Sequence, residues 1–149
     1  MKNLQNDTLL NYDITIIYMK AYLVIKFHED YKNRKLIEQI SEALQKAGFK
    51  SIVIVRDYEK WGKIRFTPKE LMKLTFKLID ESELLVVEFS EKGVGLGIEA
   101  GYAYSKNKPI IVIAKRNSDI STTLRGISKE IFFYEEPEEL TEKFNKLKL

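Results

Sequence analysis

The chain has 149 residues, the size of one domain, and 44% of them are hydrophobic, so a disordered or low-complexity chain is excluded. The net charge is only +3, from 25 basic and 22 acidic side chains, which argues against a nucleic acid polymer as partner. Because the chain has no cysteine and one histidine, it excludes disulfides, thiol nucleophiles, and metal sites built from cysteines or several histidines.

The apolar stretch 14–27 near the start of the chain is not expected to enter a membrane. Lys20 and Lys26 interrupt it, and its uncharged part is far shorter than the roughly 18–20 residues that a spanning helix needs. Asp7, Asp13 and the lack of a small-residue cleavage site argue against a signal peptide. We therefore expect a cytoplasmic protein with no membrane partner.

Met19 and Lys20 look like a natural start, because a predicted strand follows them at once. Residues 1–18 are accordingly expected to be an N-terminal extension that the protein can lose, and residues 19–149 a single α/β domain.

Apolar runs and helical spacing alternate along the rest of the chain. Strands are predicted at 22–27, 51–55, 84–89, 109–114 and 131–134, and helices at 31–47, 68–80, from the glycine-rich segment 93–101 to about 106, and at 137–147. The helix at 68–80 has the clearest start, since Thr67, Pro68 and Glu70 form a capping box with proline in the first position.

The strands are continuously apolar, which is typical of a parallel sheet with helices on both faces. Five strands in this order predict a flavodoxin-like, doubly wound α/β fold with the strand order 2-1-3-4-5. Ligands of such sheets bind beyond the carboxyl ends of the strands, at the switch point between strands 1 and 3. This rule selects residues 26–28 and 90–97 as the candidate site.

The most informative segment is the glycine-rich run at 93–101, which leads into a helix. Gly93, Gly95 and Gly97 free backbone N–H groups to face a ligand, and the start of a helix favours an anion such as phosphate. Glu99 is expected in the first turn of this helix, where the same field would keep it ionised. An ionised carboxylate in a crevice suits a nucleophile that attacks an anomeric carbon.

Three interpretations of this segment remain open. The first is a tight turn with a glutamate that complements the helix dipole. The second is a dinucleotide site, since Gly95, Gly97 and Ala100 fit G-x-G-x-x-A, although the motif follows the third strand and no acidic residue ends the next one. The third is a glycosyl-transfer site with Glu99 as nucleophile.

The chain resembles the nucleoside 2-deoxyribosyltransferase family, including the 2'-deoxynucleoside 5'-monophosphate N-glycosidases, over about residues 21–135. The resemblance is carried by the run 94–103, by Tyr22 and by the segment 121–126. The resemblance implies the same flavodoxin-like fold and a deoxynucleoside or its 5'-monophosphate as substrate. It implies that Glu99 attacks C1' of the deoxyribose and expels the base, with no metal or organic cofactor. It also implies a homodimer or larger assembly with sites near subunit contacts.

The chain departs from the family pattern at two single positions and in the segment 25–28, which replaces the usual small residues after Tyr22. Thr75 stands where the family usually has an aspartate that handles protons at the base, and Gly93 stands where it has an acid or a serine. The missing acid could be replaced by Asp57, Glu59 or Glu91, and the sequence leaves this choice open. Proton transfer by such an acid normally raises the reaction rate by about 10²–10⁴-fold. The alternative function is therefore a nucleotide-binding module that has lost its chemistry.

Further side chains are candidates for substrate binding, each with a structural alternative. His28 suits proton transfer or phosphate binding, or is a solvated loop residue. Lys26 ends the same strand and can attract phosphate. Trp61 can stack on a base or anchor its own loop. The predicted substrate-binding residues are Tyr22, His28, Asp57, Trp61, Ser90, Gly95, Gly97 and Ser121.

Overall fold

The computed structural model describes residues 18–149. They form one five-stranded sheet in the order β2-β1-β3-β4-β5, and every neighbouring pair is parallel. The strands are β1 (Met19–Val24), β2 (Phe49–Ile52), β3 (Leu84–Glu88), β4 (Ile110–Lys115) and β5 (Glu130–Tyr134). The helices are α1 (Arg34–Lys46), α2 (Ile54–Asp57), α3 (Pro68–Asp80), α4 (Val94–Ser105), α5 (Thr122–Ile127), η1 (Pro137–Glu139) and α6 (Leu140–Asn145). The predicted fold class and strand order are confirmed.

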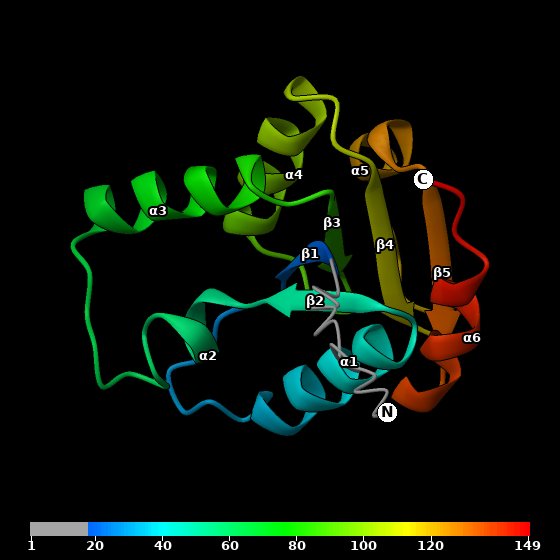
Figure 1. Cartoon of the computed structure of the whole chain (residues 1–149), viewed down its shortest axis with the longest axis horizontal. Helices are drawn as coiled ribbons and strands as arrows, with labels where there is room; N and C mark the ends of the chain where they lie inside the picture. Colours follow the sequence, from blue (N-terminus) through cyan, green and yellow to red (C-terminus); the bar gives the residue numbers. More distant parts are fainter. Residues whose placement is uncertain (1–17) are drawn as a thin grey trace, which may run out of the picture.

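The sheet separates two apolar cores, as the continuous apolar strands predict. Alternate side chains of β1 enter different cores: Ala21 and Leu23 pack with α1 and α6, whereas Tyr22 and Val24 pack with α3, α4 and α5. Figure 1 shows α1 and α6 on one side of the sheet and α3 and α4 on the other. Tyr22 therefore projects from a central strand toward the helix that carries the glycine motif.

Two segments differ from the expected elements. The predicted strand 51–55 ends at Ile52, and α2 begins directly after it because the Asp57 carboxylate accepts a hydrogen bond from the Val53 N–H (2.8 Å). Between the predicted strands 109–114 and 131–134, where no helix was expected, the chain forms α5, whose first turn is capped by the Ser121 hydroxyl. By contrast, α3 has the predicted bounds and the predicted capping box between Thr67 and Glu70.

The expected N-terminal extension, residues 1–18, lies outside the described residues except for Tyr18. Among the helices of residues 18–149, none has the length and apolar character needed to cross a membrane.

Candidate active site

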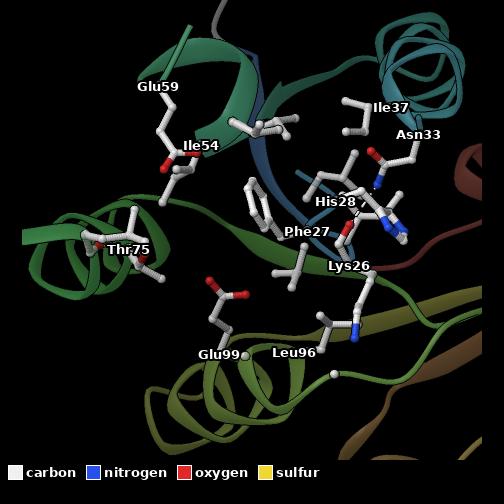
Figure 2. A pocket seen from close by; sticks show the side chains of 18 of the residues that line it. Lys26, Phe27, His28, Asn33, Ile37, Ile54, Glu59, Thr75, Leu96 and Glu99 are labelled. Atoms are coloured by element: carbon white, nitrogen blue, oxygen red, sulfur yellow. Dashed lines mark hydrogen bonds between the residues drawn. The ribbon is translucent and has the colours of Figure 1, made fainter. Parts of the chain in front are cut away.

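A cavity of about 500 Å³ opens beside the carboxyl end of β1, at the switch point between β1 and β3. Its walls come from the end of β1 and the following loop, from α2 and α3, and from the start of α4. The polar side chains in the wall are those of Tyr22, Lys26, His28, Tyr31, Asn33, Glu59, Thr75 and Glu99. Figure 2 shows Glu99 projecting from α4 into this space. The predicted position of the site is thus occupied by a cavity.

Glu99 lies in the second turn of α4, not in the first turn as expected, because the helix already begins at Val94 inside the glycine segment. Burial raises the pKa of Glu99 to about 7. The expectation that the helix field keeps the carboxylate ionised is therefore wrong: the dipole effect fades beyond the first turn, and loss of hydration is stronger. At neutral pH the group exchanges readily between its two protonation states.

Tyr22 connects the central strand to this carboxylate. Its hydroxyl lies 3.4 Å from Oε1 of Glu99 and donates a hydrogen bond to it, which lowers the pKa of Glu99 against the effect of burial. The phenol is buried, and burial together with the charge on Glu99 raises the pKa of Tyr22 well above its usual value. Tyr22 therefore stays protonated and acts as a donor to Glu99.

Two further groups face the cavity from α3 and from the loop after α2. Thr75 is buried, and its hydroxyl donates to the Leu71 carbonyl oxygen at 2.8 Å, so its proton is already committed. Glu59 lines the cavity with a partly buried side chain, and burial raises the pKa of its carboxyl group. Glu59 is thus the second carboxyl group of the cavity wall.

The other two acids considered as replacements have different places. Asp57 accepts from the Val53 N–H and pairs with the Arg56 guanidinium at 2.8 Å. Glu91 pairs with Nε2 of His28 at 2.9 Å and does not line the cavity. Of the three candidates, only Glu59 shares the cavity with Glu99.

Lys26 brings a cation to the opposite side of the cavity. Its Nζ donates to the Lys92 carbonyl oxygen at 3.0 Å. A Cβ atom at Gly93 would lie 3.3 Å from Cδ and 3.8 Å from Nζ of Lys26, so the lysine stem fills the space of the missing side chain. Asn33, a residue that the sequence did not single out, donates to the Lys26 carbonyl oxygen at 2.8 Å and holds the loop that follows β1.

Of the predicted substrate-binding residues, Tyr22, His28 and Gly95 line the cavity with Glu99. A Cβ atom at Gly95 would meet no atom within 4 Å, so the start of α4 presents bare backbone to the space. Phe27 belongs to the segment 26–28 that the switch-point rule selects, although it was not named as a substrate-binding residue, and it also lines the cavity with 57% of its surface exposed.

The other five predicted residues do not line this cavity: Asp57, Trp61, Ser90, Gly97 and Ser121. Trp61 packs edge-on against Tyr31, with ring centroids 6.2 Å apart, and Arg34 lies 4.5 Å above its ring.

Ser90 belongs to a buried network at the end of β3. Its N–H and hydroxyl donate to Glu88, and its hydroxyl oxygen accepts from the Lys115 N–H at 2.8 Å. Gly97 and Ser121 border a separate hollow between α4 and α5, which Lys26 also reaches. Ser90, Gly97 and Ser121 therefore lie near the cavity without forming its wall.

Over residues 18–149, the structure shows no group of three or more histidine or carboxylate side chains arranged to hold a metal ion. The polar groups in the cavity wall are two carboxyl groups, two phenols, an imidazole, an ammonium group, a carboxamide and a hydroxyl.

No family model matches the chain. A curated protein of Thermofilum pendens named "Putative 2'-deoxynucleoside 5'-phosphate N-hydrolase 1" is 29% identical over 141 residues, which cover 87% of this chain and 94% of that protein.

Solved structures show the same fold. CMP N-glycosidase BcmB of Clostridium botulinum superposes with a TM-score of 0.62 at 20% identity, over 85% of this chain and 97% of that one. A 2-deoxyribosyltransferase of Bacillus psychrosaccharolyticus gives a TM-score of 0.63 at 14% identity, over 82% and 90%. The relative of Thermofilum pendens supports the resemblance to the nucleoside 2-deoxyribosyltransferase family and its N-glycosidase relatives, and the solved structures share the fold.

Proposed function

We propose that this protein is an enzyme that cleaves or transfers at the N-glycosidic bond of 2'-deoxynucleosides or their 5'-monophosphates. The observation that carries the proposal is the position of Glu99: its carboxyl group projects from α4 into a cavity and accepts a hydrogen bond from Tyr22. The names of the Thermofilum relative and of the two solved structures point to the same bond.

In the proposed mechanism, the ionised Glu99 is the nucleophile. One of its oxygens bonds to C1' of the sugar while the C1'–N bond breaks and its electron pair leaves with the base. Water or a second base then attacks C1' and restores the carboxylate. Tyr22 holds Glu99 in place, and because its phenol stays protonated it offers a donor throughout.

The proposed function implies one orientation of the nucleotide in the cavity. Figure 2 shows Glu59 and Lys26 on opposite sides of Glu99. With the sugar at Glu99, a 5'-phosphate would lie near Lys26 and the bare backbone of Gly95 at the start of α4, where N–H groups favour an anion. The base would then lie toward Glu59 and the apolar side chain of Ile54.

We also propose that the enzyme acts in the cytoplasm as a homodimer or larger assembly. The exposed apolar side chains of Val94, Ile98 and Tyr104 on α4 supply surface that a second copy can cover. Light scattering of the purified chain measures the assembly directly.

The test is incubation with a panel of 2'-deoxynucleosides and their 5'-monophosphates, with released base followed by chromatography. The wild type should release base from at least one of them, and Glu99→Gln should lose that activity by about 10³-fold or more, as expected for loss of a nucleophile. Glu81→Gln, at the exposed end of α3, is the matched control. A fully active Glu99→Gln would refute the mechanism.

A second function, a nucleotide-binding module without chemistry, is favoured by one observation. Thr75 replaces the acid that the family resemblance leads one to expect, and its hydroxyl proton is bonded to the backbone. This alternative predicts thermal stabilisation by nucleotides with no release of base, and a ligand at a hundred times its Kd stabilises a protein by about 2.7 kcal/mol.

A further inference from the structure

The cavity contains a carboxyl group that the mechanism above does not use. Glu59 is fixed by its backbone: its N–H donates to the Ile54 carbonyl oxygen at 3.0 Å, and its own carbonyl oxygen accepts from the N–H groups of Gly62 (3.0 Å) and Ile64 (2.9 Å). The loop that carries it is therefore pinned on both sides. Among the residues that the structure describes, no hydrogen bond or ion pair to the Glu59 carboxyl group is found.

The surroundings of Glu59 favour the protonated form of its carboxyl group more than water does. Burial raises the pKa of Glu59, and its charge, with that of Glu99, raises the pKa of the Tyr22 phenol, so the three groups share one electrostatic environment. In Figure 2 the Glu59 carboxyl group points into the cavity beside Ile54, on the side of Glu99 away from Lys26. A base attached to a sugar at Glu99 would extend toward this group.

We propose that Glu59 is a catalytic residue, the general acid that protonates the departing base. The inference rests on the proposed function and deepens it. It also accounts for the threonine on α3, because the acid comes from the loop after α2 instead.

The protons balance over the two steps. As the C1'–N bond breaks, the electron pair goes to the base, and the Glu59 carboxyl group gives its proton to a ring nitrogen or oxygen of that base. The base departs neutral, Glu99 is bound to C1', and Glu59 is a carboxylate. Glu59 then takes a proton from the water that attacks C1', which breaks the ester bond and returns Glu99 as a carboxylate.

The experiment compares two leaving groups on the same sugar phosphate in the wild type, Glu59→Gln, Glu99→Gln and the control Glu81→Gln. One substrate is the deoxynucleoside monophosphate that the wild type cleaves fastest; the other is 4-nitrophenyl 2-deoxyriboside 5-phosphate, whose nitrophenolate leaves without a proton. Glu59→Gln should lower kcat/KM on the nucleotide by about 10²–10⁴-fold, the usual contribution of a general acid, and leave kcat/KM on the nitrophenyl substrate within about threefold. The comparison uses kcat/KM because this constant covers only the steps up to release of the leaving group, and so excludes the later step in which Glu59 takes a proton from water. Glu99→Gln should abolish both reactions.

The outcomes separate the two proposals. If Glu59→Gln lowers kcat/KM alike for both substrates, or for neither, Glu59 is not the acid although the enzyme assignment stands. If the wild type cleaves neither substrate, both proposals fail.

A second measurement decides the case in which the wild type rejects the nitrophenyl substrate. The kcat/KM of the wild type on the nucleotide should fall at high pH as the acid loses its proton, and Glu59→Gln should lose that decline. The groups that line the cavity with Glu59, namely Tyr22, Tyr31, Lys26, His28 and Glu99, remain in the variant. A decline that persists unchanged in Glu59→Gln would overturn the assignment.

Discussion

The hydroxyl of Tyr22 lies 3.4 Å from Oε1 of Glu99, and this contact joins the buried central strand to the helix that follows the glycine segment. The strand is fixed by pairing with two neighbours, β2 and β3. Glu99 thus takes its position from the sheet as well as from its own helix. Two opposing effects act on its pKa: burial raises it, and the donor from Tyr22 lowers it.

Tyr22→Phe should shift this balance toward protonation. Without the donor, the pKa of Glu99 should rise above its value of about 7, and a smaller fraction of the nucleophile is ionised at neutral pH. The acidic limb of the kcat/KM profile should move to higher pH, and activity at pH 7 should fall about tenfold, the size expected for one hydrogen bond to a charged group.

The pH profile between about pH 5.5 and 9 checks this, since it reports the pKa values of the free enzyme. Tyr102→Phe is the matched control. The Tyr102 phenol lies on α4, the helix that carries Glu99, but it donates to Asp80 (2.9 Å) away from the cavity. An acidic limb that stays in place in Tyr22→Phe would show that the contact does not control the ionisation of Glu99.

Glu99→Gln should increase stability at high pH more than at low pH. The pKa of Glu99 is raised from 4.5 to about 7 in the folded chain, so between these values the folded state holds a proton that the unfolded state has lost, and stability falls as pH rises. The neutral glutamine avoids this loss. The gain in Tm over the wild type should therefore be several degrees at about pH 8 and small at about pH 5.

Thermal unfolding of both proteins at the two pH values measures the difference, with Glu81→Gln at the exposed end of α3 as reference. The same gain at both values would mean that burial does not hold Glu99 in its neutral form.

The sequence was sufficient for the architecture because the strands are buried on both faces and their apolar runs are unbroken. It also singled out Glu99, through the glycine motif, and Tyr22, through the family resemblance, and both line the cavity. It misjudged the ionisation of Glu99, because the pKa of a carboxyl group depends on how closely side chains from other elements exclude water.

The loop residues were harder to place. Asp57 and Glu59 stand two positions apart in the same segment, and composition does not distinguish them. Their roles separate only when α2 forms: the turn directs Asp57 to the backbone of Val53 and leaves Glu59 at the cavity wall. Trp61 likewise has partners, Tyr31 and Arg34, that come from a distant part of the sequence.

Asp57→Ala should therefore act on stability rather than on chemistry. The change removes the acceptor for the Val53 N–H and the partner of Arg56, whose guanidinium also donates to the Ser41 hydroxyl at 2.7 Å. The free energy of unfolding should fall by about 1–3 kcal/mol, the cost of leaving such groups without partners. Chemical denaturation measures it, and Asp57→Asn, which keeps an acceptor oxygen, should recover part of the loss. Unchanged stability with a large loss of kcat would contradict this role.

Lys26→Met should raise KM for nucleotides but not for nucleosides. The methionine keeps an aliphatic stem beside Gly93 but removes the ammonium group, which retains free donor capacity while one of its protons is bonded to the Lys92 carbonyl oxygen. If Lys26 binds the 5'-phosphate, KM for the monophosphate should rise about 10–100-fold, since hydrogen bonds between charged groups contribute roughly 1.5–3 kcal/mol. KM for the matching nucleoside should change by less than about twofold, because it has no phosphate to lose. Lys46→Met, at the exposed end of α1, is the control for the loss of one positive charge. An equal rise of KM for both substrates would place the phosphate elsewhere and leave Lys26 as a support for the start of α4.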